Sequence, residues 1–285
     1  MRRKAHVRFG EGHGETRSHG LWGRVTLCAL CLLYKSTTAV NLGACLAVLG
    51  RRVLLVDVDP QGNATSGAGV DKGQIKACIY DAIISERPVS ALTVKTEVGG
   101  LDLVPATIRL AGAEIELVPV MSREVRLRRA LEEVRGRYDY VLIDCPPSLG
   151  LLTLNALTAA DSVLVPIQCE YYALEGLSQL LNTVSLVQKH LNPGLHIEGV
   201  LLTMYDSRTN LSQQVSEEVR QFFKEKVYNT VIPRNVKLSE APSYGKPIIL
   251  YDDKSKGAEA YRALAVEMAG AGEGHGDFQQ AEGQG

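Results

Sequence analysis

Short apolar runs alternate along this chain with longer segments in which apolar residues recur at helical spacing. The short runs predict strands at 52–56, 101–104, 140–143, 162–166, 197–203 and 230–232. The longer segments predict helices at 36–49, 122–135, 149–159, 174–190, 212–226 and 258–268. This alternation predicts an α/β fold in which a mostly parallel sheet has helices on both of its faces.

The same pattern predicts one domain, because neither an internal repeat nor a long linker interrupts it. A chain of 285 residues with 45% hydrophobic residues is long enough to bury one large core. We expect this domain to span 25–269, with the apolar run 25–33 able to form its first strand. Residues 1–24 are expected to be irregular. Residues 270–285, which lack Lys and Arg, are expected to form a disordered tail.

Composition removes several classes of protein. A net charge of -1 gives no overall bias toward nucleic acid or membrane, so DNA binding would need a local basic patch. Six scattered cysteines suit a reducing cytosol, and Cys28 and Cys31 lack a second pair at zinc spacing. No apolar stretch reaches the roughly 18 residues of a membrane span. We therefore expect a cytoplasmic protein without membrane attachment. We also expect no signal peptide, because the apolar run 25–33 leads straight into a helix.

Candidate chemistry lies where apolar strands end in carboxylates. The run Val-Leu-Leu-Val-Asp-Val-Asp-Pro-Gln-Gly-Asn at 53–63 places Asp57 and Asp59 after one strand. The run Tyr-Val-Leu-Ile-Asp at 140–144 places Asp144 after another. Ligands of open α/β sheets bind outside the carboxyl ends of the strands, so these side chains are expected at one site. One such carboxylate alone is weak evidence, because turn residues are often acidic.

A lysine and a hydroxyl residue at the start of the helix at 36–49 complete the pattern of a nucleoside-triphosphate site. In such sites the lysine meets the β and γ phosphates and the next hydroxyl binds Mg²⁺, the roles predicted for Lys35 and Ser36. Asp144 is predicted to hold the metal through water and Asp59 to orient the attacking water. Asp57 is predicted to support the metal shell.

Five motifs stand out along the chain. They are Lys-Ser-Thr-Thr-Ala-Val-Asn-Leu at 35–42, the run at 53–63, Ile-Asp-Cys-Pro-Pro-Ser-Leu at 143–149, Gln-Cys-Glu-Tyr-Tyr-Ala-Leu-Glu-Gly at 168–176 and Ile-Pro-Arg-Asn-Val-Lys-Leu-Ser-Glu-Ala-Pro at 232–242. Together they resemble the ParA/Soj family of chromosome-partitioning ATPases, a branch of the deviant Walker A P-loop class that also includes MinD. The resemblance covers residues 35 to about 269, over four-fifths of the chain.

The resemblance implies a P-loop NTPase fold and an ATP-dependent dimer switch that uses ATP and Mg²⁺. It implies a homodimer formed on ATP binding, double-stranded DNA bound without sequence preference, hydrolysis stimulated by a ParB-like partner, and a nucleoid-associated location. A replication initiator is a further partner that it leaves open. By position it also assigns nucleotide contacts to Thr37, Pro233 and Arg234, and DNA contacts to Arg208 and Lys237, which without the family would be taken for ordinary solvated charges.

One departure from the family pattern is large. Where the family has Lys-Gly-Gly-Val-Gly, residues 30–34 are Leu-Cys-Leu-Leu-Tyr. The glycines let backbone N–H groups curl around phosphate, whereas Leu32 and Tyr34 would narrow that nest. The family's signature lysine would fall at Leu30 and is absent. We therefore expect this chain to bind ATP poorly or not at all.

Two explanations and two functions follow. Because the match stops abruptly at Lys35, we hypothesise that residues 1 to about 34 arise from a frameshift or wrong gene start. The rival explanation is a nucleotide-free paralogue.

The first function is a ParA-type ATPase in chromosome or plasmid partitioning. The second is an inactive scaffold that binds partition or replication proteins without hydrolysis. A MinD-like membrane role ranks third, because the acidic tail cannot form a basic amphipathic helix.

Overall fold

The computed structural model describes residues 24–28, 35–170 and 173–273 and arranges them around one central sheet. Within these residues the sheet has eight strands in the order β3-β4-β2-β5-β1-β6-β7-β8. The strands are β1 (Arg24–Cys28), β2 (Val53–Asp57), β3 (Val94–Lys95), β4 (Leu101–Val104), β5 (Tyr140–Asp144), β6 (Ser162–Gln168), β7 (His196–Tyr205) and β8 (Val227–Pro233). All neighbours are parallel except β3 and β4, which confirms the predicted fold class.

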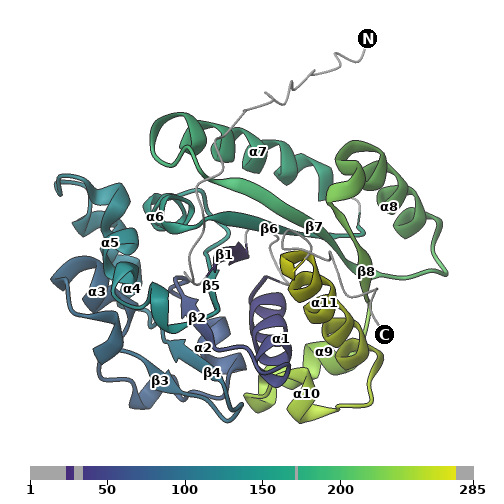
Figure 1. Ribbon diagram of the computed structural model, residues 1–285, viewed down its shortest axis with the longest axis horizontal. Helices are drawn as coiled ribbons and strands as arrows, with labels where there is room; N and C mark the ends of the chain where they lie inside the picture. The colour runs from purple at the N-terminus through teal and green to yellow at the C-terminus, as the bar shows by residue number, and fades with distance from the viewer. Residues whose placement is uncertain (1–23, 29–34, 171–172, 274–285) are drawn as a thin grey trace, which may run out of the picture.

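Helices cover both faces of this sheet (Figure 1). One face packs against α3 (Ile79–Ser85), α4 (Leu110–Glu116), α5 (Arg126–Glu132), α6 (Leu151–Ala159), α7 (Ala173–His190) and α8 (Asn210–Phe223). The other packs against α1 (Lys35–Val48), α2 (Asn63–Gly67), α9 (Val236–Glu240), α10 (Ile248–Tyr251) and α11 (Lys256–Glu273). In β2, Leu54 and Val56 enter the first core and Val53 and Leu55 the second. Burial on both faces explains why the first four residues of this strand are apolar.

The apolar run at 25–33 supplies the first strand, as predicted. β1 lies between β5 and β6, with Arg24 opposite Tyr140 and Cys28 opposite Asp144 in the parallel register with β5. The strand is shorter than the run, and residues 29–34, which include the departure from the family pattern, lie outside the described residues. The end of β1 is thus level with the carboxylate that ends β5.

Polar contacts fix α1 against the C-terminal helices. The hydroxyls of Thr38 and Tyr261 lie 3.1 Å apart in a hydrogen bond between α1 and α11. The Asn41 Oδ1 atom accepts a hydrogen bond of 2.6 Å from the backbone N–H of Ile248, at the start of α10. All three helices belong to one buried core. The first turn of α1 therefore has a defined position at the edge of the sheet.

The structure differs from the predicted elements in the connections. The region predicted as one helix at 122–135 contains only the seven-residue α5, between two short 3-10 turns. Helices α3, α4, α9 and α10, of four to seven residues, were not predicted. α11 continues past residue 270 to 273, and residues 274–285 of the predicted disordered tail lie outside the described residues. No helix of the described part is long and apolar enough to cross a membrane.

Candidate functional site

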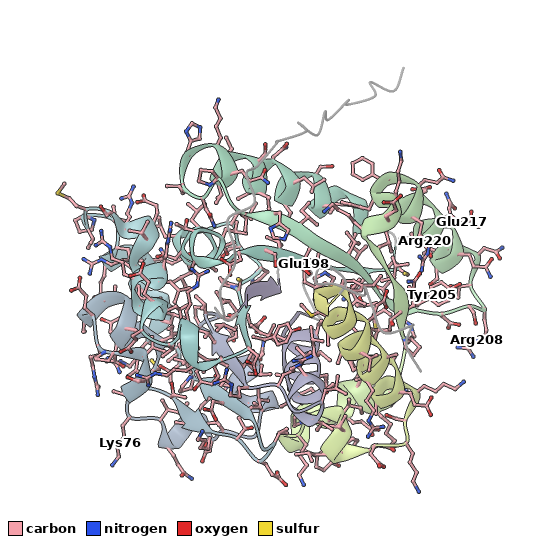
Figure 2. The ribbon with its side chains drawn as sticks, viewed as in Figure 1. Lys76, Glu198, Tyr205, Arg208, Glu217 and Arg220 are labelled. Carbon is pink, nitrogen blue, oxygen red and sulfur yellow. The ribbon has the colours of Figure 1, made fainter. Side chains whose placement is uncertain are left out.

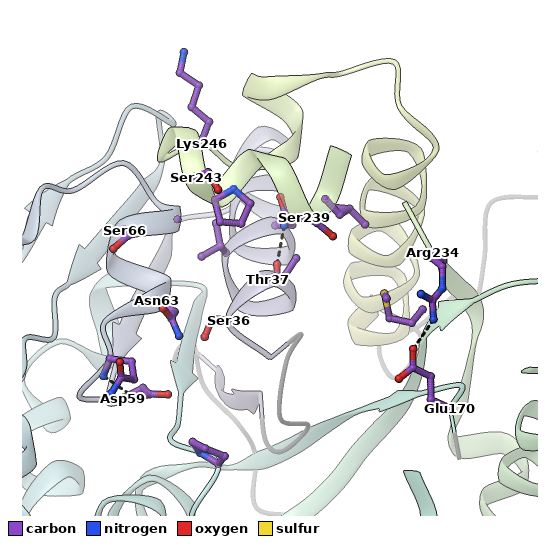
Figure 3. A pocket seen from close by; sticks show the side chains of 18 residues that line it. Ser36, Thr37, Asp59, Asn63, Ser66, Glu170, Arg234, Ser239, Ser243 and Lys246 are labelled. Atoms are coloured by element: carbon purple, nitrogen blue, oxygen red, sulfur yellow. Dashed lines mark hydrogen bonds and ion pairs between the residues drawn. The ribbon is translucent and has the colours of Figure 1, made fainter. Parts of the chain in front are cut away.

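A pocket of about 800 Å³ opens at the edge of the sheet where the parallel strands end. One side is formed by the first turn of α1, the loop after β2 and α2 (Figure 3). The other side is formed by Glu170 after β6, Met204 in β7 and side chains between 234 and 246. This is the edge at which ligands of open α/β sheets bind, and it is where the sequence predicted a site.

Ser36 and Thr37 line this pocket from the first turn of α1. Backbone N–H groups in the first turn of a helix lack partners within the helix, so this end of α1 favours an anion. Lys35 is the first residue of α1, and its side chain lies outside the described part of the structure. Of the three residues predicted from the start of this helix, the structure thus brings Ser36 and Thr37 to the pocket and leaves Lys35 as a prediction.

Asp59 lines the pocket from a loop whose backbone is closely fixed. Its Oδ1 atom accepts a hydrogen bond of 2.9 Å from the N–H of Gln61, and its carbonyl accepts one of 2.8 Å from the N–H of Gly62. Gly62 has φ of 61°, a conformation that glycine adopts without strain. On the outer side, Lys72 Nζ donates to the Gln61 carbonyl at 2.9 Å. Asp59 is therefore held at the pocket wall by its own turn.

Asp57 lies behind the pocket wall and is fully buried. Its Oδ1 accepts from the N–H of Asp59 at 3.1 Å, and its Oδ2 accepts from both the N–H and the hydroxyl of Thr65, each at 2.7 Å. Burial raises the pKa of Asp57 to about 6, and these hydrogen bonds oppose the rise. Asp57 is not among the residues that line the pocket, so its predicted metal contact stays a prediction.

Asp144 is also fully buried, at the end of β5 and opposite Asp57 in the strand register. Its carbonyl accepts a hydrogen bond of 2.8 Å from the N–H of Val58, which joins the ends of the two strands. From the same motif, Pro147 reaches the pocket wall. The structure thus brings the three predicted carboxylates to neighbouring strand ends, but only Asp59 faces the pocket.

The opposite wall combines apolar side chains with one ion pair. Arg234 pairs with Glu170 across the ends of β8 and β6, and both residues line the pocket. Met204 lines it with φ of 54°, next to an irregularity in the pairing of β7 with β8. A non-glycine residue in this conformation is strained, and such residues are often found at binding sites. Pro233, predicted beside Arg234, ends β8 and does not line the pocket.

Several pocket residues were not singled out from the sequence. They are Val40, Asn41, Gln61, Asn63, Ser66, Gly67, Pro147, Glu170, Met204, Leu238, Ser239, Pro242, Ser243 and Lys246. Most belong to the motifs at 35–42, 53–63, 143–149, 168–176 and 232–242, so their place in those motifs was the available signal. Ser66, Gly67, Met204, Ser243 and Lys246 lie beyond them. Figure 3 shows Asn63 and Ser36 on the same side of the pocket as Asp59, away from Arg234 and Glu170.

The two predicted DNA contacts lie outside the pocket. Arg208 is on the exposed loop between β7 and α8, at the periphery of the molecule (Figure 2). Lys237 is half-exposed in α9, where Nζ contacts Glu240 at 2.9 Å and lies 5.6 Å from the ring centre of Tyr251. Both cations are paired with a nearby carboxylate in this structure, and both remain predictions as DNA contacts.

The fold and the pocket define a member of the P-loop class that contains the ParA and MinD ATPases. Residues 33–197 match the family described as AAA domain. The chain is 68% identical over 238 residues to the sporulation initiation inhibitor protein Soj of Bacillus subtilis (84% of this chain, 94% of the relative). It is 61% identical to the chromosome partitioning protein ParA of Myxococcus xanthus over 234 residues (82% and 83%).

A solved structure from Mycobacterium smegmatis, described as cobyrinic acid a,c-diamide synthase with bound ADP and magnesium, is 41% identical. It superposes with a TM-score of 0.77 over 89% of this chain and 97% of that one. This chain belongs to the ParA/Soj family of chromosome-partitioning ATPases.

Proposed function

We propose that this chain derives from a partition ATPase and that its pocket takes ATP with Mg²⁺ once the family's glycine loop is restored at residues 30–34. In this proposal the nucleotide-bound form dimerises and binds chromosomal or plasmid double-stranded DNA without sequence preference, and a ParB-like protein stimulates hydrolysis. The observation that carries the proposal is the composition of the 800 Å³ pocket. Ser36 and Asp59 lie on one side, and Met204, Leu238 and Pro242 provide an apolar wall on the other.

The described side chains suit a magnesium nucleotide. Mg²⁺ is usually held by one or two carboxylate or hydroxyl ligands together with phosphate oxygens, rather than by a complete protein cage. The pocket offers the Ser36 hydroxyl as such a ligand, and no cluster of three or more His, Cys, Asp or Glu occurs among the described residues. When bound, the metal would neutralise charge on the phosphates. Ser36 would hold it, and Asp59 would orient water at the pocket wall.

The phosphate side is where the sequence argues against tight binding. Residues 30–34 include Leu32 and Tyr34 at sequence positions where the family has glycine, and glycine is the residue that lets successive backbone N–H groups curl around phosphate without a Cβ in the way. This observation favours a second candidate function, a ParA-like scaffold that binds its partners without ATP. The two candidates share the fold and differ in one measurable property, which is affinity for Mg-ATP.

Calorimetric titration of Mg-ATP into two forms of the protein distinguishes these candidates. The first form is the full chain, and the second is the loop-restored variant, in which residues 30–34 are replaced by Lys-Gly-Gly-Val-Gly. We expect no binding at micromolar concentrations by the full chain. The loop-restored variant should bind ATP and become dimeric by light scattering when ATP is added. Ser36→Ala in the loop-restored variant is the matched control and should weaken binding that depends on Mg²⁺.

Two other outcomes of the titration would also decide between the ATPase and the scaffold. Micromolar binding by the unmodified chain would show that Leu32 and Tyr34 do not block the phosphates, and would remove the case for the scaffold. A loop-restored variant that is folded by circular dichroism but does not bind ATP would place the defect outside residues 30–34. That result would favour the scaffold function over the ATPase.

A further inference from the structure

A chain of hydrogen bonds joins the Asp59 loop to the end of a neighbouring strand. Asp57 Oδ1 accepts from the Asp59 N–H, and Asp57 Oδ2 accepts from the Thr65 hydroxyl at 2.7 Å. The Thr65 hydroxyl in turn accepts from the N–H of Ala106 at 3.0 Å. Asp57, Thr65 and Ala106 are fully buried, and Asp59 is 5% exposed. One hydroxyl thus connects the loop after β2 with the loop after β4, 41 residues away.

The geometry of this chain requires a hydroxyl group at position 65. The group donates one hydrogen bond and accepts another at the same time, which neither a methyl nor a thiol reproduces well. Both partners are buried, so water cannot take the place of a missing partner without entering the core. Serine retains this chemistry, whereas valine retains the shape of threonine without it.

A second contact links the same two loops. An added Cβ atom at Gly62 would lie 3.0 Å from the carbonyl oxygen of Ala106, so the two backbones are in close approach. Ala106 therefore contacts the Asp59 loop through its carbonyl and, through Thr65 and Asp57, by its N–H. Any displacement of Ala106 is expected to move Asp59, because the two side chains between them, Thr65 and Asp57, are buried and held by hydrogen bonds.

We propose that Thr65 is a positioning residue that fixes the Asp59 loop relative to Ala106. This inference rests on the proposed role of Asp59 in orienting water, and it extends that role to a residue that does not itself line the pocket. Without the Thr65 hydroxyl, the Asp57 carboxylate loses one of its three donors and the Ala106 N–H loses its acceptor. The Asp59 loop then becomes mobile while the pocket keeps its lining residues.

Amide hydrogen exchange followed by NMR tests this coupling in the full chain. Thr65→Val should speed exchange at the Asp59 and Ala106 amides at least tenfold, and Thr65→Ser should stay within threefold of the parent. Thr158→Val is a matched control, because its hydroxyl is also buried but donates within α6 to the Leu154 carbonyl at 2.7 Å. It should leave both amides unchanged. Equal exchange at Asp59 in the Val and Ser variants would overturn the proposal.

Folding of the variants must be checked by thermal melting. If Thr65→Val does not fold, Thr65→Ala removes the hydroxyl without placing a methyl group against the Asp57 carboxylate, and the same exchange rates are expected. Failure of both to fold, with a folded Thr65→Ser, would show that the hydroxyl is needed for the fold itself. That result would also overturn a specific positioning role.

Hydrolysis provides a second readout in the loop-restored variant. There, Thr65→Val should lower kcat at least tenfold with KM for ATP within twofold, because Thr65 acts on Asp59 and not on ground-state binding. Thr65→Ser should retain at least a third of kcat, and equal kcat in the two variants would contradict the proposal. A loop-restored parent without hydrolysis would refute the proposed function, while the exchange rates would still decide whether Thr65 fixes Asp59.

Discussion

Arg208 and Asp206 form a two-point ion pair on the loop between β7 and α8. Arg208 Nε donates to Asp206 Oδ1 at 2.9 Å and Nη2 donates to Oδ2 at 2.7 Å. The hydrogen bonds from Arg208 lower the pKa of Asp206 to about 2, so the carboxylate is ionised at neutral pH. The arginine is 84% exposed, and solvent screens the pair. A DNA phosphate that contacts Arg208 must therefore compete with Asp206.

Lys237 shows a similar arrangement on α9. The Glu240 Oε2 atom accepts from Lys237 Nζ and from the Tyr251 hydroxyl, each at 2.9 Å. The hydrogen bond to Glu240 raises the pKa of Lys237, which stays charged at neutral pH. Both predicted DNA contacts are thus charged, and each is paired with a nearby carboxylate. Their contribution to DNA binding can therefore be measured by substituting either the cation or the carboxylate that pairs with it.

Removing both cations should weaken DNA binding uniformly. For Arg208→Ala with Lys237→Ala in the ATP-bound loop-restored variant, each lost phosphate contact removes about 0.9 from the slope of log affinity against log salt. Fluorescence anisotropy on several duplex sequences measures this slope. Lys76→Ala with Arg128→Ala removes the same charge from exposed sites and is the control. Figure 2 shows Lys76 on the opposite side of the molecule from Arg208. Equal affinities in the two double variants would remove Arg208 and Lys237 from the interface.

Neutralising Asp206 should have the opposite effect. Asp206→Asn releases Arg208 from its ion pair and removes a negative charge close to the approaching phosphate, so DNA affinity should rise about threefold or more at low salt. The same anisotropy measurement gives the result. The gain should disappear when Arg208→Ala is added, since the freed guanidinium is its cause. A gain that persists without Arg208 would indicate a general charge effect.

The strands other than the two-residue β3 could be predicted, though not their order in the sheet, because burial on both faces leaves a strong pattern. β2 and β5 are apolar at nearly every position and end in Asp57 and Asp144. Both the apolar runs and the carboxylates that end them are visible in the sequence. Helices such as α3 and α4 were missed because seven residues hold too few turns to show a helical period. Their positions depend on packing against the sheet, which a local pattern does not record.

The site was predicted in its location and only partly in its contacts. The sequence places Asp57 and Asp59 at one strand end, but not the direction of each carboxylate. Asp57 faces Thr65 inside the protein, whereas Asp59 faces the pocket. The bond from Ala106 to Thr65 spans 41 residues, and the pairing of Glu170 with Arg234 spans 64, so no local motif indicates either one.

The charge of Asp59 should be needed for hydrolysis and not for nucleotide binding. In the loop-restored variant, Asp59→Ala should bind ATP and form the dimer while hydrolysis falls to background, because the carboxylate acts on the attacking water. Asp59→Asn is the sharper variant, since its amide oxygen can still accept the 2.9 Å hydrogen bond from Gln61. It should be nearly as inactive as the alanine variant. Hydrolysis by Asp59→Asn at the parent rate would transfer the role to another group.

The buried carboxylate of Asp57 should make stability depend on pH in the chain as it stands. Burial raises its folded-state pKa to about 6, above an unfolded value of about 3.9, so the folded state binds this proton more tightly. The stability that this group contributes is therefore fully present below about pH 4 and is lost as pH rises through about 6.

Urea denaturation of the parent and of Asp57→Asn, at pH 5 and at pH 7.5, measures this contribution. Asparagine cannot titrate. Subtracting the unfolding free energy of Asp57→Asn from that of the parent therefore cancels the contribution of the other carboxyl groups to the pH dependence. The difference should be smaller at pH 7.5 than at pH 5 by about 1 kcal/mol. A difference that is equal at the two pH values would mean that Asp57 is already ionised at pH 5. Its three donors, from Asp59 and Thr65, would then outweigh the cost of burying the charge.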